Sequence, residues 1–167
     1  MAAVPSSETF ANLFSIPYSP LVFAGVAAAL AVVGLLLNPV ILRLNAASAS
    51  GLTPDFPRSL WRLVPMLFFG AAVEELAHRL ALYVWISTLA SLLLPPVAAF
   101  SMSALAFGIL FALTHRYGML WPRVKGALIY SAALLLTGSI LMPIAAHFLY
   151  NLMLLLIYRD VLTGSGT

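Results

Sequence analysis

Residues 60–94 decide the fold, and they read LWRLVPMLFFGAAVEELAHRLALYVWISTLASLLL. The stretch is apolar and long enough to cross a bilayer, since one helical span takes about 20 residues. Arg62 stands at its start, but its other charged side chains, Glu74, Glu75 and Arg79, fall near the middle. Two prolines at 95–96 then end it. We therefore predict a membrane helix that carries charge inside it.

The composition extends this pattern to the whole chain. Of 167 residues, 63% are hydrophobic and 8% are charged, too few polar groups to cover a soluble domain. The length leaves room for about five spans and for no second domain. We expect an all-α, polytopic transmembrane bundle that forms one domain over 1–167. The expected parts are a tail over 1–20, spans over about 21–44, 60–94, 97–117, 126–140 and 143–158, and a core over 60–158.

The charged residues outside the spans indicate topology rather than a nucleic-acid partner. The formal net charge of +3 comes from only eight Lys and Arg against five Asp and Glu. Lys and Arg gather after spans one, three and five, which puts the N-terminus outside and the C-terminus in the cytoplasm. The first twenty residues hold no Lys or Arg, so we expect no cleaved signal peptide. Cysteine is absent, which excludes disulfides and thiolate nucleophiles.

The acidic pair in the second predicted span needs an explanation. Each charge inside hydrocarbon costs about 2.5–3.5 kcal/mol unless it is paired or faces a polar cavity. Glu75 and Arg79 stand four residues apart and can pair along the helix, and the same spacing sets Glu74 over His78. An ion pair that only fixes helix packing is the alternative interpretation.

Two further spans carry polar side chains. His115 ends the third, while His147 and Asn151 share one face of the fifth because they are four residues apart. Each alone is compatible with a packing role or an interhelical hydrogen bond. Together with the acidic pair, they give the groups needed to activate a water and to stabilise an oxyanion.

The order and spacing of these residues resemble the CPBP family, the CAAX-processing and bacteriocin-processing intramembrane proteases. The resemblance covers about residues 60–151. It rests on three motifs and two elements that precede the last one: Glu74-Glu75-x-x-x-Arg79, Phe111-x-x-x-His115, His147-x-x-x-Asn151, Thr137-Gly138-Ser139-Ile140 and Pro143-Ile144.

This resemblance implies an endopeptidase that hydrolyses a peptide bond of a membrane-associated protein or peptide. Glu74 with His115 would activate the water, His147 and Asn151 would stabilise the oxyanion, and Glu75 and Arg79 would be supporting residues. His78 stands where the family usually has an aromatic or aliphatic residue, and its pairing with Glu74 would either tune that base or disable it.

A zinc ion is an alternative, because the family is often labelled metalloprotease and a Glu with two His can bind zinc. We favour a site without a metal or other cofactor, since the HExxH spacing is missing and His147 with Asn151 is better suited to donate hydrogen bonds. Straight spans would also separate Glu74, His115 and His147 by more than roughly 10 Å along the membrane normal, at about 1.5 Å per residue. Pro and Gly near 118–122 and 138–143 would allow tilted or broken helices to close that gap.

The expected location is a bacterial inner membrane, with membrane lipid, the substrate and other membrane subunits as partners. A catalytically silent subunit that serves structure or assembly is the second hypothesis. A small ion or solute carrier using the carboxylates is the third, although the chain lacks the internal repeats of many transporters.

Overall fold

The structure is a computed structural model that describes residues 12–16, 18–38, 60–81, 87–114 and 120–163. Those residues form helices and turns and no strand, which confirms the all-α prediction. The helices are α2 (Pro20–Leu36), α4 (Leu60–Ala81), α5 (Ser87–Ser91), α6 (Pro96–Thr114), α7 (Leu120–Thr137) and α8 (Leu141–Thr163).

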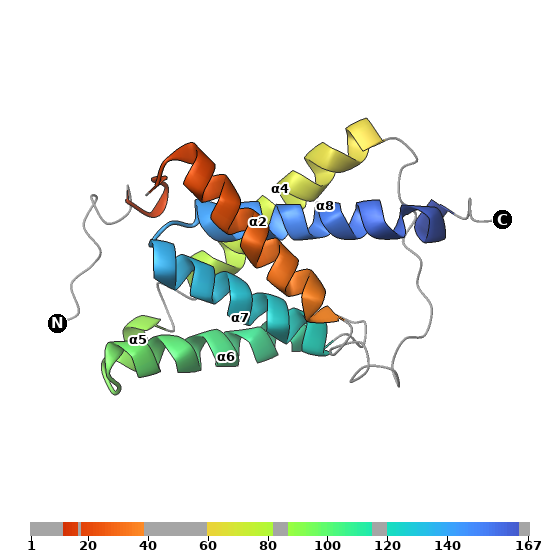
Figure 1. The fold of residues 1–167 in the computed structure, drawn as a ribbon. Coiled ribbons are helices and arrows are strands. Elements are labelled where there is room, and N and C mark those ends of the chain that lie inside the picture. Colours follow the sequence, from red (N-terminus) through yellow and green to blue (C-terminus); the bar gives the residue numbers. More distant parts are fainter. Residues whose placement is uncertain (1–11, 17, 39–59, 82–86, 115–119, 164–167) are drawn as a thin grey trace.

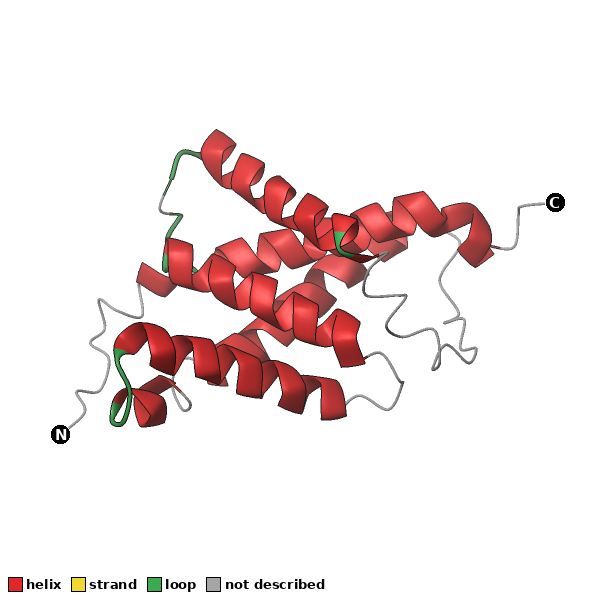
Figure 2. Cartoon of the chain, turned by 60° about the horizontal axis from the view of Figure 1, so that its bottom comes forward, coloured by secondary structure: helices red, strands yellow, loops and turns green. Residues whose placement is uncertain are grey.

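Helix α8 is the centre of the bundle. It packs against α2, α4 and α7, while α6 lies along α7 and the short α5 beside α6 (Figure 1). Figure 2, turned by 60°, shows α6 and α7 again side by side. Ala27, Ala133 and Met142 form a buried apolar cluster that joins α2, α7 and α8. Side chains on α8 can therefore meet three other helices.

Small residues let α2 approach α8 closely. Ala27, Ala31 and Gly34 are its buried positions. A Cβ added at Gly34 would lie 3.1 Å from Cδ2 of Tyr150, so any larger residue would require the ring or α2 to shift by a few tenths of an ångström. This contact brings the C-terminal end of α2 against the side of α8 that carries Tyr150.

The turn between α7 and α8 fixes where α8 begins. Gly138 has φ +66°, a left-handed conformation that ends α7, and its N–H donates to Leu134 O at 2.7 Å. The Thr137 hydroxyl donates to Ala133 O at 2.7 Å. The Ser139 hydroxyl then accepts from the Leu141 N–H at 3.3 Å, as a residue preceding a helix often does. The turn sets the register of α8 and so the face on which its polar residues lie.

Two predicted boundaries are wrong. The fourth span was expected to begin at 126 after a basic loop, but α7 begins at Leu120, so Arg123 and Lys125 are helical. Pro122 does not prevent this, because a proline in the first turn loses no intrahelical hydrogen bond. The stretch 60–94 also does not stay helical to its end, since α5 ends at Ser91 and a turn follows at Leu92 and Leu93.

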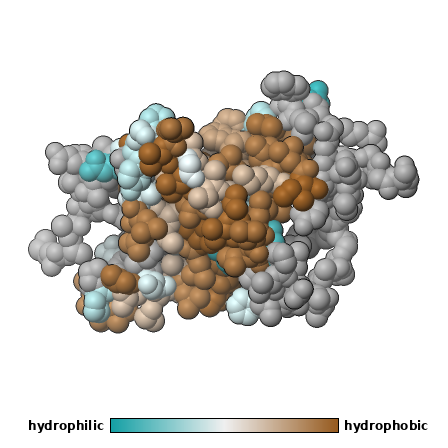
Figure 3. Space-filling view, in the orientation of Figure 1, coloured by the Kyte–Doolittle hydropathy of each residue, from teal (hydrophilic) through white to brown (hydrophobic). Residues whose placement is uncertain are grey.

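Large apolar side chains are exposed on every long helix. They cover much of the face shown in Figure 3. Highly exposed examples on these helices include Leu21, Leu36, Phe69, Val97 and Leu136, at 84%, 70%, 65%, 72% and 73%.

Within the described residues, no helix meets the combined requirements of length and apolarity for a bilayer crossing.

Candidate active site

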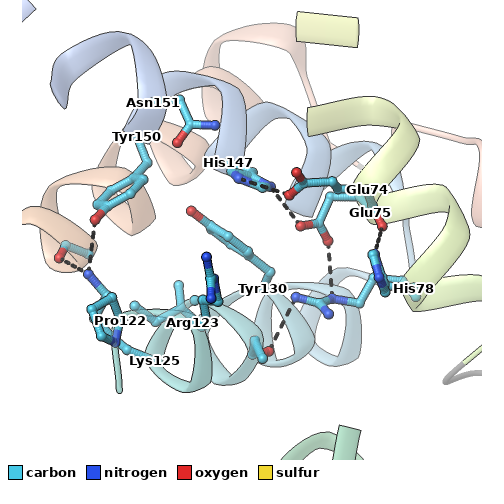
Figure 4. A pocket seen from close by; sticks show the side chains of 15 residues that line it. Glu74, Glu75, His78, Pro122, Arg123, Lys125, Tyr130, His147, Tyr150 and Asn151 are labelled. Carbon is cyan, nitrogen blue, oxygen red and sulfur yellow. Dashed lines mark hydrogen bonds and ion pairs between the residues drawn. The ribbon is translucent and has the colours of Figure 1, made fainter. Parts of the chain in front are cut away.

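A cavity of about 310 Å³ lies where α2, α4, α7 and α8 meet (Figure 4). Most of the predicted polar residues line it, from α4 and α8. Gly34 also lines the cavity. The polar lining residues are Glu74, Glu75, His78, Arg79, Arg123, Lys125, Tyr130, His147, Tyr150 and Asn151. Acidic, basic and amide groups therefore converge on one partly open cavity.

Glu75 stands at the centre of the polar contacts. Its Oε2 lies 3.1 Å from Arg79 Nε, and both side chains are 4% exposed, so the predicted ion pair along α4 is present and buried. Its Oε1 lies 2.9 Å from Nδ1 of His147 on α8, a contact that the sequence did not predict. One carboxylate thus joins a guanidinium of its own helix to an imidazole of another.

Arg79 extends this network to α7. Its Nη2 donates to the carbonyl oxygen of Ala127 at 3.4 Å. The guanidinium carbon also lies 5.6 Å from the ring centre of Phe107 and 5.9 Å from that of Tyr130, within the range of cation–π attraction. The guanidinium of Arg79 therefore contacts the Glu75 carboxylate, a carbonyl oxygen and two aromatic rings.

Glu74 has a different environment from its neighbour. Its side chain is 46% exposed, and its Oε2 lies 3.9 Å from Nε2 of His147. His78, predicted to sit against Glu74, contacts it through the main chain: its Nδ1 donates to the Glu74 carbonyl oxygen at 2.6 Å. Among the two acidic residues, Glu74 is the one that an incoming molecule can reach.

These contacts assign the two nitrogens of His147 to different tasks. A carboxylate accepts hydrogen bonds, so Nδ1 carries a hydrogen and donates a hydrogen bond to Oε1 of Glu75. Nε2 then faces Glu74. That nitrogen accepts a proton when the ring is neutral and donates a hydrogen bond when the ring is charged. The ring is oriented in the way that hydrogen-bonded carboxylates orient catalytic histidines.

Straight spans would have set Glu74 and His147 more than roughly 10 Å apart, but the structure brings them together, as the predicted site requires. Helices α4 and α8 pack directly on one another, and the polar stretch of each lies at that contact. Asn151 lies one turn beyond His147 on α8 and lines the same cavity. His115 lies outside the described residues, so its predicted place beside Glu74 stays a prediction.

Tyr130 is a cavity residue that the sequence did not single out. Its ring stacks on that of His147, with centres 4.8 Å apart and planes 20° apart. Nothing in the sequence pattern separates this tyrosine from the other aromatic residues of the spans. Only the packing of α7 against α8 reveals it.

Lys125 was predicted to lie in a loop, and it instead links three helices. Its Nζ donates to Gly34 O at 2.8 Å, to Asn38 Oδ1 at 2.5 Å and to the Tyr150 hydroxyl at 3.2 Å. The Tyr150 hydroxyl also donates to Asn38 Oδ1 at 2.9 Å. Pro122 was the available signal, because proline is favoured in the first helical turn and so marks an earlier start for α7.

The described part of the chain holds no group of three His, Asp or Glu side chains placed to bind a metal ion. Glu74 and His147 would supply two ligands of the zinc site considered above, and its third, His115, is not described.

The comparisons with known proteins concern the same region. A family model described as "Type II CAAX prenyl endopeptidase Rce1-like" matches residues 56–153, more than half of the chain. The matched region runs from before α4 into α8 and includes Glu74, Glu75, Tyr130, His147 and Asn151. No curated protein and no solved structure matches the chain.

Proposed function

Because the chain belongs to the Rce1-like family of type II CAAX prenyl endopeptidases, we propose that it is an intramembrane endopeptidase. Its substrate would be a membrane-associated protein or peptide. The observation that carries the proposal is the pair formed by Glu74 Oε2 and His147 Nε2, 3.9 Å apart at the cavity. A water about 2.8 Å from each atom would fit between them with ordinary hydrogen-bond geometry.

In the proposed reaction, Glu74 is the general base. Its carboxylate takes a proton from the water while the water oxygen forms a bond to the carbonyl carbon of the scissile peptide. The carbonyl π electrons move to oxygen and give a tetrahedral oxyanion. The C–N bond then breaks, and the leaving nitrogen takes the proton from Glu74. A positioned base contributes typically about 10²–10⁴-fold to such a step.

The oxyanion needs donors that are in place before the reaction. We assign this role to the Asn151 amide and to Nε2 of His147 in its protonated form, since both groups line the cavity from one face of α8. Loss of one such donor costs about 10²–10³-fold in other hydrolases. Glu75 and Arg79 would be positioning residues, because Glu75 holds His147 at 2.9 Å and Arg79 holds Glu75. His115 would assist Glu74, and His78 would tune it.

We also propose that the chain crosses a membrane several times, with the N-terminus outside and the C-terminus in the cytoplasm. It is supported by the exposed apolar side chains on all the long helices, since a surface of this kind marks contact with lipid or a partner. The proposed setting is a bacterial inner membrane. We also propose that the reaction needs no metal ion.

A catalytically silent structural subunit is the second candidate. The observation in its favour is that the Glu75–Arg79 pair is 4% exposed and tied to Ala127 of α7, an arrangement that would stabilise a bundle without any chemistry. In this case the cavity residues would matter for assembly with other membrane proteins and not for turnover.

Cleavage of a library of membrane-tethered peptides by the purified chain in liposomes tests the two candidates. The enzyme hypothesis predicts new peptide ends, formed equally with and without a chelator. Cleavage that stops with the chelator and returns with zinc would keep the hydrolase but overturn the metal-free mechanism. A folded chain that cuts nothing and co-purifies with a defined membrane complex would favour the silent subunit.

A further inference from the structure

Tyr130 lines the cavity, and no step of the reaction proposed above involves it. It belongs to α7, whereas the assigned groups lie on α4 and α8. Its side chain is buried, with the residue 6% exposed. Figure 4 shows its hydroxyl pointing into the cavity, toward the side lined by Tyr150 and Asn151. The phenol therefore faces the space in which a substrate would lie.

The aromatic ring is held from two directions. It stacks on His147 with planes 20° apart, and the guanidinium carbon of Arg79 lies 5.9 Å from its centre. A tyrosine side chain has only two rotatable bonds, so contacts of this kind leave the hydroxyl little freedom. The same contacts that fix His147 also fix the position of the phenol oxygen.

The hydroxyl of Tyr130 has no hydrogen-bond partner among the described residues. Tyr130 contacts other described residues through its ring, and the described part of the chain gives its hydroxyl no hydrogen bond. The hydroxyl points into the cavity and is not among the described buried polar atoms that lack a hydrogen-bond partner, so it is open to water or to a ligand. A carbonyl oxygen of a bound peptide would satisfy this donor.

We propose that Tyr130 is a further catalytic residue, whose hydroxyl donates a hydrogen bond to the carbonyl oxygen of the scissile peptide and to the oxyanion formed from it. The ring would also act as a positioning group by holding the plane of His147. No proton is transferred, because the phenol keeps its hydrogen throughout. This inference rests on the endopeptidase function proposed above.

The Tyr130→Phe variant separates the hydroxyl from the ring. Phenylalanine keeps the stack on His147 and removes only the donor. We expect kcat to fall by about 10²–10³-fold, the loss typical of one oxyanion donor, with a much smaller change in KM. Tyr18→Phe is the matched control, because that exposed tyrosine precedes α2 outside the cavity, and it should leave kcat unchanged.

The Tyr130→Leu variant tests the ring. In ¹⁵N-histidine NMR spectra, ring stacking should shift the His147 resonances in wild type and in Tyr130→Phe, and the shift should disappear in Tyr130→Leu. The pH profile of kcat/KM should move in Tyr130→Leu only.

Wild-type kcat in Tyr130→Phe would overturn the proposed role of the hydroxyl, and unchanged His147 resonances in Tyr130→Leu would overturn the role of the ring. If the wild type itself cuts no peptide, the endopeptidase function fails first. If the wild type cuts peptides and Tyr130→Phe cuts them equally fast, the endopeptidase function stands and only the proposed role of the Tyr130 hydroxyl is refuted.

Discussion

Glu75 Oε1 lies 2.9 Å from Nδ1 of His147, and this contact joins residues 72 positions apart in the sequence. It links the acidic motif of α4 to the histidine of α8. Since the other oxygen of Glu75 pairs with Arg79, the contact also explains why two adjacent glutamates have different surroundings. Glu75 is buried between Arg79 and His147, while Glu74 is open to the cavity.

Glu75→Gln should destabilise the protein strongly. The substitution keeps the shape of the side chain but leaves the buried Arg79 charge without its partner, which costs typically about 3–5 kcal/mol. Thermal unfolding in detergent measures this effect. Glu74→Gln is the matched control, because the Glu74 side chain is 46% exposed, and its unfolding temperature should stay close to wild type. Equal unfolding temperatures for the two variants would contradict the assignment.

Removing both partners of the buried pair should cost less than removing one. In the double variant Glu75→Gln, Arg79→Met, no charge remains unpaired at this position, and a similar apolar volume replaces the guanidinium stem. We expect the double variant to unfold at a higher temperature than Glu75→Gln alone. Additive losses in this double-mutant cycle would mean that the two residues act independently.

The close approach of α2 and α8 can be tested with two glycines of the same helix. Gly34→Ala would place a Cβ 3.1 Å from the Tyr150 ring, so the ring or α2 must shift and stability should fall. At Gly25 a Cβ meets nothing within 4 Å, so Gly25→Ala should raise stability by up to about 1 kcal/mol through helix propensity. Unfolding temperatures that move in the same direction for both variants would argue against this packing.

Lys125→Met should loosen the attachment of α2. Methionine has a similar length but cannot donate to Gly34, Asn38 and Tyr150. The chain contains no cysteine, so one introduced at a chosen position gives a unique maleimide probe. At the buried Ala31, labelling should be slow in wild type and faster in Lys125→Met.

A cysteine at the exposed Val32 provides the control for this labelling experiment. It should react at the same rate in both backgrounds. If Lys125→Met leaves the labelling rate at position 31 unchanged, the lysine does not hold α2 in place.

The sequence predicted the helical class and much of the cavity because both depend on local spacing. Residues four apart share a helix face, so the Glu75–Arg79 pair and the common face of His147 and Asn151 follow from the numbering. The burial cost of charge in an apolar stretch pointed to Glu74 and Glu75 as special positions.

The contacts between helices could not be predicted in the same way. The pairing of Glu75 with His147, the stacking of Tyr130 and the three bonds of Lys125 depend on which helices pack together and at what register. Treating each helix as a straight, separate span put Glu74 and His147 at different depths. Packing of α4 against α8 brings them within 3.9 Å.

The central claim is that Glu74 activates the attacking water, and the most direct test is the single-turnover cleavage rate of Glu74→Gln in liposomes beside its unfolding temperature. The mechanism predicts a loss of at least about 10²-fold in rate, with the unfolding temperature of the wild type. A folded Glu74→Gln variant that cuts at the wild-type rate would contradict it.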